Sequence, residues 1–179
     1  SHWLPRPVDD ALLMRAWNLA RLGPTSANCQ PLRVLFVRSP EAKTRLKACL
    51  APGNIDKTMN SPVTALFAAD TRFYDHLPRL YPHADARSWF AGDDLKALAH
   101  TTAERNSSLQ AAYFMMAARA LGLDTGPMTG FANDAVDAGF FADTPNFKSV
   151  MISTLGYGDP GSIFDRSPRP DFDTFNRMA

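Results

Sequence analysis

The chain has 179 residues and a mass of 19.7 kDa, enough for one domain with its own core and too little for two ordinary domains. Because 19 lysines and arginines balance 18 aspartates and glutamates, the formal net charge of +1 provides no field of one sign that would attract nucleic acid or an anionic membrane. A hydrophobic share of 45% and a charged share of 21% are typical of soluble globular proteins. We therefore expect one soluble domain over residues 1–179, with neither nucleic acid nor a membrane as partner.

Metal centres and hydrolytic motifs are not expected from this sequence. Cys29 and Cys49 lie too far apart for a CxxC pair and have no companion pair for zinc. The 4 histidines are scattered without HExxH spacing, and no GxSxG elbow occurs. The first residues have neither a basic start nor an apolar run, so we expect no signal peptide and a reduced, cytoplasmic setting.

Apolar periodicity in the first half predicts helices alternating with buried strands. Apolar residues recur at helical spacing from Val8 to Leu22, and a Gly-Pro pair follows them. Ser39 and Pro40 offer an N-cap and a first helical residue. The expected elements are, in chain order, a helix over 8–22, a strand over 32–37, a helix over 40–50, a buried strand over 62–69 and a short helix over 73–80.

The second half predicts one long helix, a last strand and an arm. A helix over 93–120, with one possible break near Asn106, is apolar on nearly all sides in its later half. The apolar and β-branched residues over 147–155 predict a third strand. Segment 162–179, with apolar residues among prolines, predicts an extended arm that needs a surface such as a partner subunit. Strands alternating with helices indicate a three-layer architecture of α and β elements.

One formal GxGxxG pattern, from Gly156 to Gly161, follows the last expected strand. A dinucleotide fingerprint needs a helix directly after these glycines and an acidic residue about 20 positions further on. Only 18 residues follow Gly161, and prolines interrupt them. We therefore interpret the pattern as the turn by which the chain leaves the strand.

Four other segments carry polar or glycine-rich patterns, and each has an ordinary structural explanation. The loop with Thr25, Ser26 and Asn28 is dense in hydrogen-bonding groups, which such loops often satisfy among themselves. Asn54 and Lys57 precede the second strand on an expected short turn, where a surface lysine is usually solvated. Each pattern by itself is therefore weak.

The other two segments follow the long helix. Residues 125–131 hold two glycines and a proline, which would let the backbone approach a flat ligand, although a chain reversal also explains them. Arg166 and Arg169 offer fork-shaped donors of the kind that bind phosphate, although arginines between prolines are more often solvated.

The order of these segments is more specific than any one of them. A PTSANCQP loop, a strand, an N-x-x-K turn with a strand, a helix ending ALGLDTGPMTGF, a strand ending LGYGDP and then RSPRP follow one another. This order resembles the FMN-dependent nitroreductase family over nearly the whole chain. The RSPRPDFDTF ending is most similar to the malonic semialdehyde reductase group of pyrimidine degradation.

The resemblance implies an α+β fold of three layers, with a central mixed sheet flanked by helices, in an intertwined homodimer. Residues 162–179 would be an arm that packs on the partner subunit. Two FMN molecules would lie at the subunit interface, each contacted by both chains, and NADPH or NADH would be the co-substrate.

The resemblance also implies site residues, position by position. Thr25, Ser26 and Asn28 match a loop that reaches the flavin from the other subunit. The remaining matches are Asn54 and Lys57 at the polar edge of the ring, Pro127, Met128, Thr129 and Gly130 beside N5, and Arg166 and Arg169 at the phosphate. The N–H of Thr129 would be the donor at N5. A cation at Lys57 makes physical sense, because reduced flavin carries negative charge near N1 and O2.

The implied chemistry is hydride transfer from NAD(P)H through the flavin to a small acceptor, with no catalytic side chain. Malonic semialdehyde, reduced to 3-hydroxypropanoate, is the first expectation, and a nitroaromatic or quinone is the alternative. The family's N-terminal Arg-x-Ser-x-Arg element, a source of phosphate ligands, has no match where this sequence begins Ser1-His2-Trp3. Either that element lies outside this sequence or His2 is its remnant. An alternative of another class follows, a non-catalytic interaction protein with a degenerate flavin site.

Overall fold

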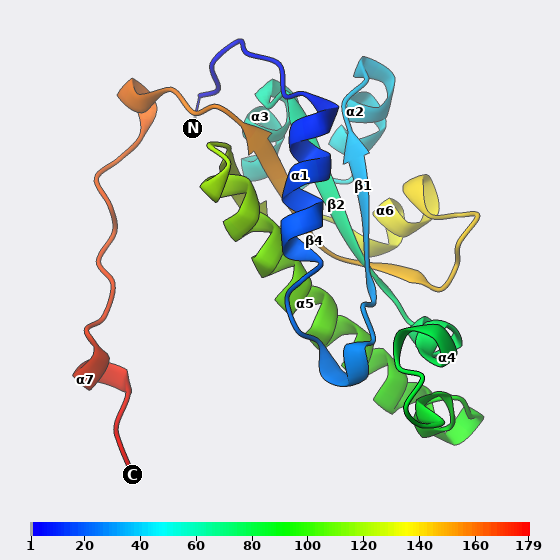
Figure 1. Cartoon of the computed structure of the whole chain (residues 1–179). Coiled ribbons are helices and arrows are strands. Elements are labelled where there is room, and N and C mark those ends of the chain that lie inside the picture. The colour runs from blue at the N-terminus through cyan, green and yellow to red at the C-terminus, as the bar shows by residue number, and fades with distance from the viewer. Residues whose placement is uncertain (1) are drawn as a thin grey trace.

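A four-stranded sheet forms the centre of the computed structural model, which describes residues 2–179 (Figure 1). Its strands are β1 (Leu32–Val37), β2 (Val63–Asp70), β3 (Asp124–Met128) and β4 (Phe147–Gly156). They stand in the order β1-β2-β4-β3, and all neighbouring pairs are antiparallel. The prediction of a mixed sheet is therefore wrong, because no parallel pair occurs among these four strands. Val37 at the end of β1 pairs with Thr64 near the start of β2. The helices between these strands bring the chain back to the same end of the sheet, so β2 runs antiparallel to β1.

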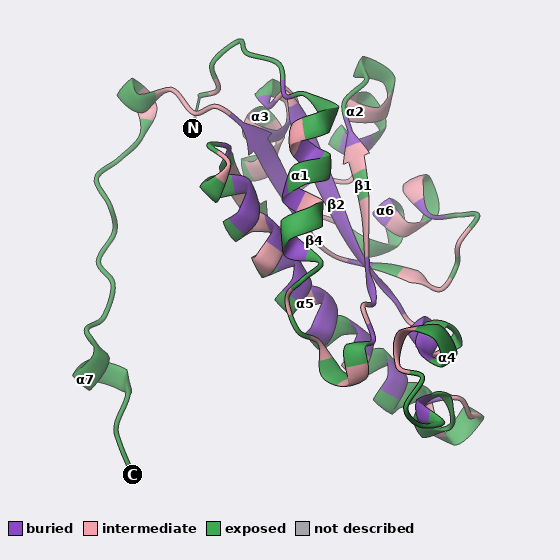
Figure 2. Ribbon diagram, viewed as in Figure 1, coloured by how far each residue is buried: buried purple, intermediate pink, exposed green. Residues whose placement is uncertain are grey.

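Helices cover both faces of this sheet. Their bounds are Asp10–Ala20 for α1, Pro40–Lys47 for α2, Pro52–Asn60 for α3, Lys96–Ala120 for α5 and Asn133–Phe140 for α6. α1 and α5 pack on one face, and α2, α3 and α6 pack on the other (Figure 1). Figure 2 shows the consequence, since β2 is buried over its whole length between the layers. The expected α+β fold of three layers is confirmed.

The largest of three apolar clusters lies between α1, α5 and the sheet. α1 turns Leu13 and Ala16 inward because apolar residues three or four positions apart share one side of a helix. On α5 the small side chain of Ala111 lets the helix approach the sheet closely. The ring of Phe114 fills the remaining space, 5.8 Å from the ring of Phe67 on β2.

Most of the expected elements are confirmed within a few residues. The three expected strands are β1, β2 and β4, and the long helix is α5. α5 continues without a break at Asn106 because the fold satisfies that buried side chain. Its Nδ2 donates to the carbonyl of Thr102 at 2.9 Å, and its Oδ1 accepts from the N–H of Ser26 at 2.9 Å.

Two local interpretations are wrong. Asn54 and Lys57 lie on the helix α3 and not on a short turn, because Pro52 opens a helix there with its fixed φ. Gly126 and Pro127 lie on strand β3 and not in a simple chain reversal. β3 is an edge strand that pairs only with β4, so the missing N–H of the proline is tolerated. The helix α6, which follows β3, was not predicted by any pattern.

Four short helices connect β2 to α5. They span Phe73–His76, Leu77–Leu80 (α4), Ala86–Trp89 and Asp93–Leu95. The single short helix expected over 73–80 is thus divided in two. The ring of Phe73 packs edge-on against that of Phe90, with centroids 5.0 Å apart. This third apolar cluster closes the end of the sheet where β2 finishes.

The C-terminal arm lies away from the body of the protein (Figure 1). From Ile163 to Ala179 every residue is exposed, and the only regular element is the single-turn helix α7 (Phe172–Phe175). Phe164 is 97% exposed and Phe175 is 79% exposed, so the arm gains no hydrophobic stabilisation within this chain. None of the helices that the structure describes combines the length and the apolar character needed to cross a membrane.

Candidate functional site

A cavity of about 410 Å³ opens where α3, β3 and the end of β4 meet. Lys57 reaches it from α3, and Gly126 and Pro127 border it from β3. Trp3 and Thr154 line it from the N-terminal segment and from β4. The cavity therefore brings together residues that the sequence placed in two separate motifs.

The N-terminal segment forms one wall of this cavity. The indole Nε1 of Trp3 donates to the carbonyl of Lys57 at 3.0 Å. Trp3 also forms a bridge with Gly158, and the N–H of Leu4 donates to the carbonyl of Tyr157 at 2.7 Å. These contacts hold the later part of α3 against the turn that follows β4.

Asn54 is held by the loop that follows β3. Its Nδ2 donates to the carbonyl of Gly130 at 2.8 Å, and that carbonyl also accepts from the N–H of Ala51 at 3.0 Å. A Cβ on Gly130 would lie 2.6 Å from the Asn54 Nδ2. A glycine is therefore needed here for the close approach of the two segments.

The strand β3 contributes Asp124, Thr125, Gly126 and Pro127 to the lining of the cavity. A Cβ on Gly126 would lie 2.4 Å from the Oγ1 of Thr154 on the neighbouring strand. Met128 is buried, and its sulfur lies 3.9 Å from the Oγ1 of Thr58 in the core. Thr129, by contrast, is exposed. Of the four residues predicted from Pro127 to Gly130, only Pro127 borders the cavity.

The charge of Lys57 has no counter-ion in the part of the chain that the structure describes. Asp124 borders the same cavity, and its Oδ2 accepts from the N–H of Gly158 at 2.8 Å. A half-buried ammonium without a partner is costly in a cavity unless a ligand or water meets it. The arrangement therefore suits a ligand that carries or develops negative charge.

Thr25, Ser26 and Asn28 are not brought to this cavity. Their loop lies at the lower end of the molecule in Figure 1, and α3 lies at the upper end. Asn28 donates from Nδ2 to the carbonyl of Leu80 at 2.8 Å. Gln110 on α5 holds the end of the loop, because its Nε2 donates to the Oε1 of Gln30 at 2.6 Å.

Cys29 follows this loop but is no nucleophile. Burial raises the pKa of its thiol to about 11, although a hydrogen bond with Thr25 acts in the opposite direction. A thiol with that pKa is almost fully protonated near neutral pH.

Arg166 and Arg169 lie on the exposed arm, and the structure does not bring them to Lys57 either. Arg169 donates from Nη1 to the carbonyls of Ser167 and Pro168, at 2.9 and 3.2 Å. The arm leaves the body beside the cavity, since Ile163 is among the residues that border it.

Three residues that line the cavity or hold the predicted loop were missed by sequence reasoning. They are Trp3, Thr154 and Gln110. Each acts through a partner between 28 and 80 positions away along the chain, so no local pattern pointed to it.

Comparison with known proteins places the chain in one family. A sequence model described as the nitroreductase family matches residues 2–157. A protein of Burkholderia lata, provisionally named NADH dehydrogenase/NAD(P)H nitroreductase, is 60% identical over 176 residues, which are 98% of this chain and 89% of the relative. The relative HadB of Ralstonia pickettii has the same provisional name. It is 56% identical over 178 residues, which are 99% of this chain and 90% of HadB.

Solved structures agree with this assignment. The nitroreductase YdfN of Bacillus subtilis has a TM-score of 0.85 and 25% identity, over 99% of this chain and 92% of the other. A nitroreductase of Exiguobacterium sibiricum, solved in complex with FMN, has a TM-score of 0.83 and 21% identity, over 100% of this chain and 91% of the other. The fold is thus that of the nitroreductases, and the chain belongs to the nitroreductase family.

Proposed function

We propose that this protein is an FMN-dependent oxidoreductase that transfers hydride from NAD(P)H to a small acceptor. The observation that carries the proposal is the cavity that Lys57, which has no ion pair among the described residues, lines together with Gly126 and Pro127 of β3. The names of the relatives, which include NAD(P)H, and the FMN complex of a structural neighbour support it. When bound, FMN would supply the hydride transfer between the two reactants.

The residues around the cavity fit a flavin ring. Gly126 and Pro127 bring the edge strand β3 to the border of the cavity, where an aromatic ring would lie against it. Lys57 would stabilise the negative charge that a flavin carries when reduced. The Nδ2 of Asn54 is bound to Gly130, which leaves its Oδ1 to accept from an N–H of the ring. The N–H of Thr129 would be the donor on the opposite edge.

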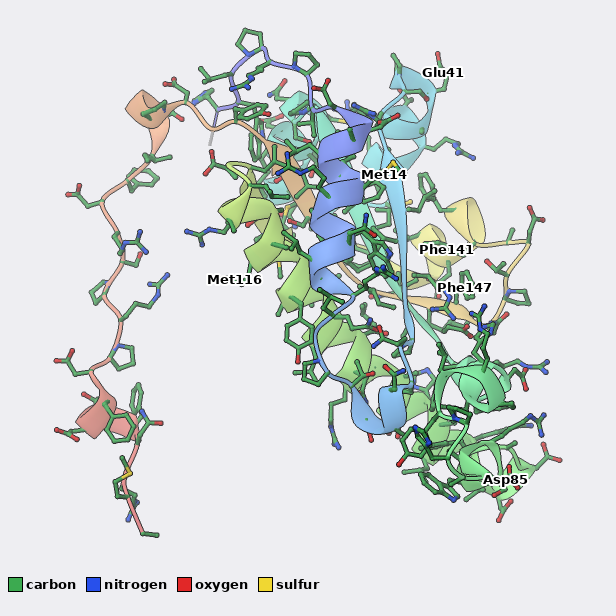
Figure 3. All side chains as sticks on the ribbon, in the orientation of Figure 1. Met14, Glu41, Asp85, Met116, Phe141 and Phe147 are labelled. Atoms are coloured by element: carbon green, nitrogen blue, oxygen red, sulfur yellow. The ribbon has the colours of Figure 1, made fainter. Side chains whose placement is uncertain are left out.

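A complete site would need a second copy of the chain. Thr25, Ser26 and Asn28 lie far from the cavity, so we propose that they contact the flavin held by a partner subunit in a homodimer. Met116 stands on the outer side of α5, 65% exposed, and gives that helix an apolar face for such a contact (Figure 3).

The arm over 162–179 belongs to the same proposal. We propose that it packs on the partner subunit and carries Arg166 and Arg169 toward the flavin phosphate. Removing residues 163–179 should then weaken both dimerisation and FMN retention. Sedimentation velocity combined with the flavin-to-protein absorbance ratio measures both, and a truncated chain that remains a dimer with full flavin content would contradict the role of the arm.

Two acceptors are candidates. The RSPRPDFDTF ending supports malonic semialdehyde, reduced to 3-hydroxypropanoate. The names of the relatives favour a nitroaromatic or quinone acceptor. Steady-state rates of the FMN-loaded enzyme with NADPH and with NADH, against each acceptor in turn, separate the two. Turnover of quinones without turnover of the semialdehyde would exclude the first candidate.

The absorbance spectrum tests the whole proposal. A yellow protein whose flavin band is bleached by NADPH or NADH under anaerobic conditions supports it. A colourless protein that does not take up FMN would instead favour the non-catalytic interaction protein with a degenerate flavin site.

A further inference from the structure

A second concave surface lies at the opposite end of the molecule from Lys57. It is a hollow of about 540 Å³ at the start of β1. Its basic lining residues are Arg21, Arg33, Arg79 and His76, and no carboxylate lines it. We call it the arginine hollow. Its size is that of a site for a small ligand or for part of a larger one.

One of these arginines is already neutralised. Arg33 donates from Nη2 to the buried carboxylate of Asp70 at 2.7 Å, and from Nη1 to the carbonyls of Gln30 and Leu32 at 2.9 and 3.0 Å. The Nε2 of His76 lies 3.6 Å from the same carboxylate. These bonds hold the Arg33 guanidinium in place, and its ion pair with Asp70 leaves it little net charge to attract a ligand.

The other two arginines retain their charge. Arg21, just after α1, and Arg79, on α4, form no ion pair with any residue that the structure describes. Two like charges facing one hollow repel each other, and a concave surface concentrates their field. Guanidinium groups also present paired N–H donors that match phosphate and carboxylate oxygens. The chain as a whole has a net charge of only +1, so this concentration of positive charge is local.

We infer that the arginine hollow binds a small anionic group, a phosphate or a carboxylate, carried by one of the two reactants. The inference rests on the proposed function, because Asn28 lines the hollow and belongs to the loop proposed to reach the partner's flavin. A reactant that approaches that flavin along this loop would pass Arg21 and Arg79. The two sources of the anion are the 2′-phosphate of NADPH and the carboxylate of an acidic acceptor.

Equilibrium binding tests the inference without turnover. The full-length, FMN-loaded protein is titrated in a calorimeter with 2′,5′-ADP, with 5′-AMP and with malonate, at low salt, where charge interactions are least screened. The double variant Arg21→Gln/Arg79→Gln is compared with the control variant Arg15→Gln. Arg15 is an exposed arginine on α1 that does not line the hollow. We expect the double variant to bind 2′,5′-ADP or malonate about tenfold more weakly or worse, and Arg15→Gln to match the wild type.

The probes and the kinetics identify the source of the anion. If it is the 2′-phosphate, 2′,5′-ADP binds more tightly than 5′-AMP, and the double variant raises KM for NADPH but not for NADH. If it is a carboxylate, malonate binds, and the double variant raises KM for malonic semialdehyde but not for an uncharged quinone.

Two results would overturn the inference. One is that neither 2′,5′-ADP nor malonate binds, or that both bind the double variant as tightly as the wild type. The other is that the double variant weakens the dimer in sedimentation while anion binding is unchanged, which would assign the hollow to a subunit contact. Bleaching of the flavin by NADH in the same samples shows separately whether the proposed function holds.

Discussion

Gln110 on α5 donates from its Nε2 to the Oε1 of Gln30 at 2.6 Å, and this bond ties the loop with Asn28 to the buried core. The Oε1 of Gln110 accepts from the N–H of Leu32 at 3.0 Å. The Nε2 of Gln30 in turn donates to the Oδ1 of Asn28 at 2.9 Å, which completes a chain of side-chain amides. Ala27, Asn28 and Gln30 have φ of 48°, 51° and 42°. These left-handed conformations cost energy in residues other than glycine, so the loop depends on such tertiary bonds.

Replacing Gln110 with leucine should destabilise the fold by about 2 to 4 kcal/mol. The change leaves the buried N–H of Leu32 and the Oε1 of Gln30 without partners, and each such loss costs about 1 to 3 kcal/mol. Urea unfolding followed by circular dichroism measures it. Lys47→Gln, at an exposed position of α2, should stay within about 0.5 kcal/mol of the wild type. Equal stability of all three proteins would show that the amide chain does not hold the loop.

Gly126→Ala should destabilise the protein by about 1 to 3 kcal/mol, the usual cost of overpacking. The new methyl would lie 2.4 Å from the Oγ1 of Thr154, which is buried. Adding Thr154→Ala should restore part of the loss, because it removes that oxygen. Thermal unfolding of the two single variants and the double variant gives the coupling, and strictly additive effects would contradict the contact.

Lys57→Ala should slow reduction of bound flavin by NADPH about tenfold or more, because a cation that stabilises the developing negative charge is lost. Lys57→Arg should keep part of the rate. The measurement is anaerobic stopped-flow absorbance at saturating donor. Lys47→Ala, an exposed lysine on α2, is the matched control. Equal rates for Lys57→Ala and Lys47→Ala would remove Lys57 from the flavin site.

The two thiols should differ in reactivity. At a pKa of about 11, only about one Cys29 thiol in a thousand is ionised at pH 8, and the side chain is fully buried. Cys49, whose pKa burial also raises, is half-buried and should react first with a disulfide reagent. Colorimetric titration should find one accessible thiol per chain, and Cys49→Ser should abolish it. Two fast thiols in the native protein would be inconsistent with this packing.

The raised pKa of Cys29 also predicts a dependence of stability on pH. The folded protein holds the thiol proton up to about pH 11, whereas the unfolded chain releases it near its ordinary value of 9.0. The contribution to stability is therefore complete below about pH 9 and is lost as the pH rises toward 11. Urea midpoints of wild type and Cys29→Ala at pH 8 and pH 10 test it. The wild type should lose more stability between these values than the variant.

Much of the fold followed from local patterns in the sequence. The apolar residues of α1 recur at helical spacing and so identify a helix. The apolar run of β2 is short and bounded by turn residues, which favours a buried strand. Pro52 was a signal for α3 that the sequence reading did not use. β3, with its Gly126-Pro127 pair, has a poor strand sequence and forms because β4 offers it an edge.

The sequence by itself determined most of the helices and strands, the absence of a strong net charge, and the motif order that resembles the nitroreductases. Only the tertiary structure decided which motifs meet. Asn54 reaches Gly130 and Gln110 reaches Gln30 across 76 and 80 positions of the chain, whereas Asn28 stays at the other end of the molecule from Lys57. The physical reason is that contacts between distant segments depend on how the helices and the sheet pack together, and no local pattern of residues encodes that packing.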